Sequence, residues 1–163
     1  MHDGVLIFVN EVKNRFPNKF TGVRVLELGS LDINGSVRTF FDFCEYVGVD
    51  WRKGPSVDIV NFAHELDYPN ETFDTVISTE MFEHDKFAEL SFINGLRMLK
   101  KGGLFVFTCA NPNRLPHLIE AGVSGYYRGL SKFHVIAWLL EYRDFSELYL
   151  QETDVDLRGW IVK

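Results

Sequence analysis

The feature of this sequence that most constrains its fold is the alternation of short apolar runs with segments of helical spacing. The apolar runs are rich in Val, Leu, Ile and Phe, which is typical of strands buried within a sheet. Several segments between them place apolar side chains three and four positions apart, as one face of a helix does. Strands that alternate with helices predict a parallel sheet covered by helices on both faces. We therefore expect an α/β fold with three layers.

The expected strands and helices follow from these runs and from the turn residues that separate them. Strands are predicted over residues 23–28, 45–49, 57–60, 73–78 and 104–109, with a closing pair over 147–151 and 159–163. Helices are predicted over residues 4–16, 36–44, 85–100 and 131–142. The segment 110–130 holds prolines and glycines at close intervals, so we expect it to be a loop.

Length and composition restrict the class of protein. A chain of 163 residues has room for one domain, so we expect a single domain over 1–163, with an N-terminal helix within 1–20. Hydrophobic residues at 46% and charged residues at 25% are typical of a globular domain and exclude a disordered chain. No apolar run approaches the roughly 18 residues of a membrane span. No basic segment precedes the apolar run 5–9, as it would in a secretory signal.

Charge and cysteine content add two further expectations. A net charge of −6 argues against broad binding to nucleic-acid phosphates. Cys44 and Cys109 lie far apart in the chain and form no metal-binding spacing. Two reduced, buried thiols suit a reducing compartment. We therefore expect a cytoplasmic protein without a metal ion.

In parallel sheets, ligands bind beyond the carboxyl ends of the strands, so the residues that follow each strand are candidates. The first predicted strand ends at Gly29, which permits a sharp turn and close approach of a ligand, and Ser30 follows it. Asp50 follows the second strand about 20 residues later, the offset of an acid that binds ribose hydroxyls. The full pattern G-x-G-x-x-G is not met, because Leu31 occupies its second glycine position. The alternative is that Gly29 belongs to an ordinary strand-to-helix turn and that Asp50 is a solvated acid at a strand end.

The segments after the third and fourth predicted strands carry further candidates. Ala63 and His64 follow the third strand, where backbone and apolar groups could hold an adenine edge. Glu83 and His84 follow the fourth strand, and a carboxylate beside an imidazole is a candidate general base. The alternative for this pair is a helix start, where acids suit the positive end of the helix dipole.

The long loop 110–130 is the candidate acceptor pocket. It carries aromatic, basic and polar side chains that could close over a small acceptor, and Arg128 could pair with an anionic one. The alternative is a packed surface loop. The pocket residues that we select are Asn111, His117, Tyr126, Tyr127 and Arg128.

Taken together, the segments resemble the class I S-adenosylmethionine-dependent methyltransferases, in their broad small-molecule-type branch. The motifs that carry the resemblance are VLELGS at 25–30, VGVD at 47–50, AHELDYPNETFDTVIS at 63–78, TEMFEH at 79–84 and LKKGGLFVFT at 99–108. The resemblance runs from about residue 20 to the end. It implies a Rossmann-like three-layer sandwich with a mostly parallel seven-stranded sheet, in which the last strand is antiparallel and lies beside the fifth.

The resemblance also implies S-adenosylmethionine as the cofactor. Glu27 and Gly29 would line its methionine part, and Ser30 belongs to the same loop. Asp50 would bind the ribose hydroxyls, and Trp51 would flank the adenine. Many relatives carry G-x-G in the first loop, whereas Leu31 stands at the second glycine position here.

Further cofactor contacts are implied after the third and fourth strands. Ala63 and His64 would lie by the adenine, while Thr79 and Glu80 would lie near the methyl-donor end. Relatives often carry an Asp at the position of Phe62 to contact the adenine amine. The absence of that Asp leaves the contact to the backbone or to His64.

Three functions remain open on the sequence. The first is methyl transfer to a small-molecule or glycan-like acceptor, with His84 and then Glu83 as the base. The second is a cofactor-binding or partner subunit with little activity of its own. The third is an NAD-dependent oxidoreductase, against which Leu31 and the closing strand pair count.

The class of acceptor is restricted mainly by motifs that the sequence lacks. It carries neither the Asp/Asn-Pro-Pro-Tyr/Phe motif nor the Pro-Cys pair of methyltransferases that act on nucleic-acid bases. A small-molecule substrate is therefore favoured, with no membrane partner. The 110–130 loop, the first helix or a second subunit must recognise it, which leaves a homo-oligomer open.

Overall fold

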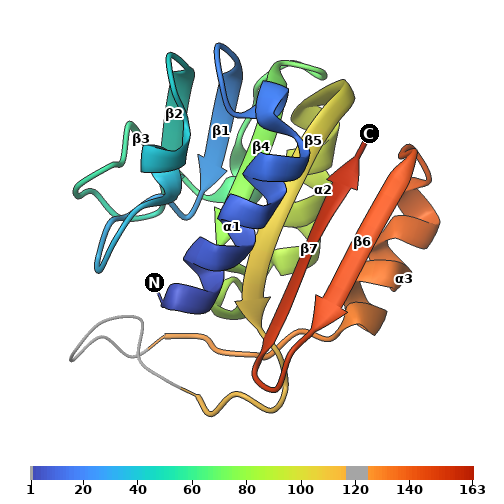
Figure 1. Cartoon of the computed structure of the whole chain (residues 1–163). Coiled ribbons are helices and arrows are strands. Elements are labelled where there is room, and N and C mark those ends of the chain that lie inside the picture. The colour runs from blue at the N-terminus through green and yellow to red at the C-terminus, as the bar shows by residue number, and fades with distance from the viewer. Residues whose placement is uncertain (1, 117–124) are drawn as a thin grey trace.

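The computed structural model describes residues 2–116 and 125–163, which contain a mostly parallel seven-stranded sheet (Figure 1). The strands lie in the order β3-β2-β1-β4-β5-β7-β6, and β7 is antiparallel to both of its neighbours. The predicted Rossmann-like α/β class and the antiparallel last strand beside β5 are confirmed. The strands are β1 (Arg24–Leu28), β2 (Glu45–Asp50), β3 (Ile59–Val60), β4 (Phe73–Thr79), β5 (Leu99–Ala110), β6 (Glu147–Glu152) and β7 (Asp156–Val162).

Strand β1 lies at the point where the strand order reverses. The chain runs outward from β1 to β2 and β3, and then returns to place β4 on the other side of β1. Leu28 pairs with Val49 on β2 and with Ser78 on β4, so these three parallel strands end at one level. Such a switch point is where open α/β sheets bind ligands. In Figure 1 the arrowheads of β1 and β5 point to the edge where the N-terminus also lies.

Helices cover both faces of the sheet (Figure 1). Helix α1 (Asp3–Arg15) packs on one face, whereas α2 (Ala88–Met98) and α3 (Lys132–Tyr142) pack on the other. The helical spacing predicted for the first helix is confirmed, because α1 buries the apolar side chains Val5, Phe8, Val9 and Val12.

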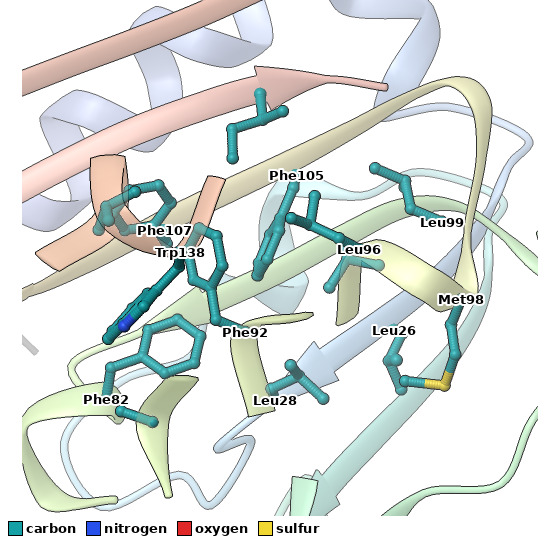
Figure 2. Packing of buried hydrophobic residues seen from close by; sticks show 14 of the residues in the cluster. Leu26, Leu28, Phe82, Phe92, Leu96, Met98, Leu99, Phe105, Phe107 and Trp138 are labelled. Atoms are coloured by element: carbon teal, nitrogen blue, oxygen red, sulfur yellow. The ribbon is translucent and has the colours of Figure 1, made fainter. Parts of the chain in front are cut away.

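The core beneath α2 and α3 is built largely from aromatic rings. Figure 2 shows Phe92 of α2 among Phe82, Phe105, Phe107 and Trp138. The ring centroids of these four residues lie 4.9–5.5 Å from that of Phe92. Edge-on and tilted contacts at this separation add to the free energy of burying the rings. Much of the phenylalanine content of the chain is therefore core.

The helix predicted over 36–44 is wrong, because only a 3-10 helix over Val37–Phe40 forms there. The backbone that follows pairs with the segment before β1 instead of continuing a helix. Asp42 N–H donates to Phe20 O, and Gly22 N–H donates to Asp42 O. The ring of Phe41 also stacks on that of Phe20, with centroids 4.6 Å apart.

The helix predicted over 85–100 is shorter than expected. Helix α2 ends at Met98, and Leu99 already pairs with Phe73 as the first residue of β5. Three further 3-10 helices connect the main elements, at Pro17–Lys19, Ala63–Glu65 and Phe82–His84. Within 2–116 and 125–163, none of the helices combines the length and apolar character needed to cross a membrane.

The aromatic core gives a direct test of the packing. Phe92→Ala should lower the free energy of unfolding by about 3–5 kcal/mol, because it removes a fully buried ring and leaves a cavity among four aromatic neighbours. Leu90→Ala is the matched control on the same helix, since the Leu90 side chain is 57% exposed and should cost less than about 1 kcal/mol. Urea unfolding of both variants measures the difference. Similar losses in the two variants would contradict this packing.

Candidate active site

A cavity of about 620 Å³ lies at the edge of the sheet where β1, β2 and β4 end. The segments after these strands line it together with His2 from the start of α1, so it occupies the switch point described above. His84 and Tyr126 also contribute to its wall. Eight of the nine predicted cofactor-binding residues line this one cavity: Glu27, Gly29, Ser30, Asp50, Trp51, Ala63, Thr79 and Glu80.

Gly29 turns the chain out of β1 into the cavity wall. Its backbone has a φ of +79°, which favours glycine over every other residue. The N–H groups of Gly29 and Ser30 both donate to Val49 O, at 2.8 and 3.0 Å. A Cβ at position 29 would lie 2.5 Å from Cγ of Met81, so a larger residue would displace the segment after β4.

Asp50 is the last residue of β2 and follows Val49, whose O accepts the hydrogen bonds from Gly29 and Ser30. Its Oδ1 accepts a hydrogen bond from Arg52 N–H at 2.9 Å, which fixes the carboxyl group at the cavity wall. Burial raises the pKa of Asp50, and hydrogen bonds from the backbone of Arg52 and Leu31 oppose that rise. Leu31, at the second glycine position of the dinucleotide pattern, packs against Gly54 and also lines the cavity. A carboxylate held in this way suits hydroxyl donors on a ligand.

Apolar side chains form the wall beside Asp50. Trp51, Phe62 and Phe87 line the cavity and are 46–49% exposed, and Ile33 lies with them. Half-exposed aromatic rings at a concave site are typical of a surface that binds a planar apolar group. His64 is not among the described residues that line the cavity. Its ring packs behind the wall, with centroids 5.6 Å from Phe62 and 4.6 Å from Phe87.

Glu27 supplies a nearly inaccessible carboxyl group to the cavity. Only 2% of the residue is exposed, and its Oε2 accepts a hydrogen bond from the Tyr46 hydroxyl at 2.9 Å. Burial raises the pKa of Glu27 from 4.5 to about 7, against the lowering effect of that hydrogen bond. A buried carboxylate with this pKa favours a cationic group beside it.

A second charged group, which we call the Glu80 cluster, comprises Glu80, Arg114, Asp156 and His2. Arg114 donates to carboxylate oxygens of both Glu80 and Asp156. The His2 Nε2 lies 3.4 Å from Asp156 Oδ2 and 3.7 Å from Glu80 Oε2. Glu80 has a φ of +56°, a strained conformation for a residue with a side chain. Thr108 maintains it, because its O accepts from Glu80 N–H and its Oγ1 donates to Glu80 Oε1, both at 2.9 Å.

The Glu80 cluster also contains the one described group with a metal-like arrangement of donor atoms. The ligand atoms of His2, Glu80 and Asp156 lie within 4.8 Å of one another. The guanidinium of Arg114 already bridges the two carboxylates and supplies a positive charge there. The arrangement is therefore explained by ion pairing within the protein.

His84 faces the cavity from the 3-10 helix after β4. Its Nδ1 lies 3.3 Å from the backbone O of Tyr126. Because a carbonyl oxygen only accepts, Nδ1 carries the hydrogen, and Nε2 is the accepting nitrogen of the neutral ring. The ring of Tyr127 packs edge-on against that of His84, with centroids 5.5 Å apart. These contacts orient the imidazole at the cavity wall.

Glu83 takes a different position from the one expected of a base. It is fully buried and lies outside the described cavity wall, where its Oε1 accepts a hydrogen bond from Ala110 N–H at 3.2 Å. Burial raises the pKa of Glu83, and the nearby Glu80 carboxylate raises it further. Glu83 therefore ties the segment after β4 to the end of β5.

Most of the predicted acceptor residues also lie outside the described cavity wall. Asn111 is buried and its Nδ2 donates to Thr153 O at 2.9 Å, while Tyr127 OH donates to Arg114 O at 3.2 Å. Arg128 places its NH2 2.9 Å from His134 Nε2. His117 lies outside the described residues. Of the four described residues in this set, only Tyr126 lines the cavity.

Sequence reasoning missed several residues at the site. Arg114 and His2 line the cavity, and Met81 packs beneath the Gly29 turn. Arg114 belongs to the 110–130 segment from which the acceptor pocket was predicted, but it was not among the residues selected there. His2 and Met81 carry no comparable signal, because only tertiary packing brings them to the cavity.

Comparison with known families and structures agrees with this geometry. A family model described as a methyltransferase domain matches residues 33–107. No matching curated protein was found.

Solved structures show that this fold occurs in methyltransferases. The 1,6-didemethyltoxoflavin-N1-methyltransferase of Burkholderia thailandensis is 15% identical with a TM-score of 0.67, over 99% of this chain and 83% of that one. A putative S-adenosylmethionine-dependent methyltransferase from Methanococcus maripaludis is 15% identical with a TM-score of 0.66, over 96% and 84%. Phosphoethanolamine N-methyltransferase 2 of Haemonchus contortus is 20% identical with a TM-score of 0.64, over 89% of this chain but only 38% of that one.

The buried Glu27 carboxyl generates a prediction about stability. A folded-state pKa above the unfolded value means that the stability due to Glu27 is present below pH 4.5 and is lost as pH rises through about 7. Glu27→Gln should therefore raise the free energy of unfolding at pH 8, by up to about 3 kcal/mol, and have little effect at pH 5. Thermal unfolding at both pH values measures this. Glu11→Gln on the exposed face of α1 is the control, and an equal effect of Glu27→Gln at both pH values would contradict the assignment.

Proposed function

We propose that this chain is an active class I S-adenosylmethionine-dependent methyltransferase and that it methylates a small molecule bound beside His84. The observation that carries the proposal is the convergence of the Gly29 turn, the Asp50 carboxylate and the buried Glu27 on one cavity at the switch point. Each of these features suits a different part of one cofactor.

The cavity fits S-adenosylmethionine by the chemistry of its wall. Asp50, held by Arg52 N–H, would accept hydrogen bonds from both ribose hydroxyls. The half-exposed rings of Trp51 and Phe62 would cover the faces and edge of the adenine. Gly29 and Glu27 line the cavity at the end of β1, where Glu27 would face the ammonium group of the methionine part.

Charge supports the same assignment. S-adenosylmethionine, when bound, supplies an electrophilic methyl group on a cationic sulfonium. The cavity wall carries four acids, Glu27, Asp50, Glu80 and Asp85, against the three bases Arg52, Lys86 and Arg114. This excess of acids favours a cation there over an anion. The protein contributes chiefly by holding the acceptor in line with the methyl group and by excluding water.

His84 is the proposed base for acceptors that lose a proton. His84 lies on the cavity wall, where its imidazole could take a proton from an acceptor atom within hydrogen-bond reach. Glu83 would act as a positioning residue, because its contact with Ala110 N–H fixes the segment that carries His84. Tyr126, Arg114 and His2 would surround the acceptor.

The size of the site favours a small acceptor. A cavity of about 620 Å³ is of the size that holds small ligands, and the cofactor would fill much of it. Two of the similar structures are named for the methylation of small molecules, a toxoflavin precursor and phosphoethanolamine. A glycan-like acceptor would have to extend out of the cavity mouth.

Binding tests the cofactor assignment. Calorimetry should detect S-adenosylmethionine and S-adenosylhomocysteine at micromolar concentrations, and no binding of NAD. Asp50→Ala should weaken S-adenosylhomocysteine binding by about 1–3 kcal/mol, the scale of lost hydrogen bonds to a charged group. Asp67→Ala, an exposed acid away from the cavity, is the matched control and should leave the affinity unchanged. Binding of NAD without S-adenosylhomocysteine would exclude the proposal.

Turnover tests the proposed base. A metabolite extract incubated with methyl-labelled cofactor should yield a labelled product that mass spectrometry identifies. His84→Ala should then lower turnover by about a hundredfold, as expected for loss of a general base, with little change in cofactor affinity. Unchanged turnover would show that His84 is no base. Cofactor binding without any labelled product would favour a cofactor-binding subunit.

A further inference from the structure

On the α1 face of the sheet, Glu27 belongs to a network of hydrogen bonds and ion pairs that also includes Tyr46, Arg38 and Asp58. Tyr46 pairs with Val25 across β1 and β2, and Glu27 pairs with Gly48. Tyr46 and Glu27 are therefore diagonal neighbours on one face, a separation that an aromatic side chain can span. The Tyr46 hydroxyl donates to Glu27 Oε2 at 2.9 Å.

Arg38 fixes the position of Tyr46. Its guanidinium lies 4.6 Å from the centroid of the Tyr46 ring, and its NH2 donates to Tyr46 O at 3.2 Å. Its NH1 also forms an ion pair of 3.2 Å with Asp58, whose Oδ2 accepts from Gly48 N–H at 2.7 Å. Gly48, which pairs with Glu27 across β1 and β2, therefore belongs to the same network.

We propose that Tyr46 and Arg38 are positioning residues that keep the Glu27 carboxylate ionised and directed at the ammonium group of the methionine part of the cofactor. This inference rests on the proposed function. Neither residue lines the cavity among the described residues, so neither would touch the ligand. Their effect would pass through Glu27 alone.

The charges around Glu27 show why such a pair is needed. Burial raises its pKa, and the carboxylates of Asp32 and Asp58 raise it further. Tyr46 and Arg38 are the groups that oppose this rise, by a hydrogen bond to the carboxylate and by a nearby positive charge. Without the Tyr46 hydroxyl, Glu27 would retain its proton to higher pH and lose its attraction for a cation.

The inference is tested with two ligands that differ only beyond the sulfur. S-adenosylhomocysteine carries the amino-acid end, and 5′-methylthioadenosine lacks it. By calorimetry at pH 7, Tyr46→Phe should weaken S-adenosylhomocysteine binding about tenfold, because a hydrogen bond to a charged group is lost. Its affinity for 5′-methylthioadenosine should be unchanged. The loss should shrink as pH is raised from 7 to 8.5, because a larger fraction of Glu27 is ionised at the higher pH.

Three variants complete the design. Tyr149→Phe removes a hydroxyl that bonds Gln151 on β6 and should bind both ligands as wild type does. Arg38→Gln should reproduce the effect of Tyr46→Phe in weaker form. In a Glu27→Gln background, Tyr46→Phe should cause no further loss, as expected if its effect passes through that carboxyl group.

The outcomes separate this inference from the proposed function. If wild type binds neither ligand, the proposed function fails, and the inference fails with it. If wild type binds both and Tyr46→Phe retains full affinity for S-adenosylhomocysteine, the inference alone is overturned. Equal weakening of both ligands at every pH would also overturn it, because that pattern indicates a structural role.

Discussion

The pairing of β1 with β2 on one side and β4 on the other is the constraint on which the rest of the structure depends. This register brings the ends of three strands to one level, so that Gly29, Asp50 and Glu80 surround one cavity despite their separation in sequence. The backbone also joins the strand ends directly, since Gly29 and Ser30 both donate to Val49 O. The cavity is thus a consequence of strand order, and side chains need only supply its chemistry.

That chemistry has an electrostatic cost in the protein without its ligand. Glu27, Glu80 and Glu83 are carboxylic acids in largely buried positions, and burial raises the pKa of Glu27 and Glu83. Two strands hold these acids: Tyr46 of β2 donates to Glu27, whereas Thr108 and the backbone of Ala110, both on β5, donate to Glu80 and Glu83. Of these acids, Glu27 lines the cavity without an ion-pair partner among the described residues, and such a buried carboxylate favours a ligand that carries positive charge. A sulfonium cofactor with an ammonium group meets that requirement.

The sequence was sufficient for features that depend on local pattern, and insufficient for those that depend on tertiary packing. Apolar runs predicted the strands of the sheet, and eight of the nine cofactor-binding residues selected at or after the strand ends line the cavity. The helix over 36–44 was wrong because Asp42 pairs with the backbone of Phe20, a contact that no local pattern reveals. Asn111 was selected for its position after a strand, but it bonds Thr153 O instead of facing the cavity.

The two ends of the cavity differ in how much their geometry is determined by the sheet. At the cofactor end, the Gly29 turn and Asp50 are held by the strand backbone and by N–H groups next to it, so their position follows from the fold itself. At the proposed acceptor end, the wall is made by Glu80, Arg114, His2 and Tyr126, which lie on loops and just before α1. Loops tolerate substitution far better than a central strand does. One cofactor site can therefore be kept while acceptor recognition changes, which agrees with a fold shared by methyltransferases at only 15–20% identity.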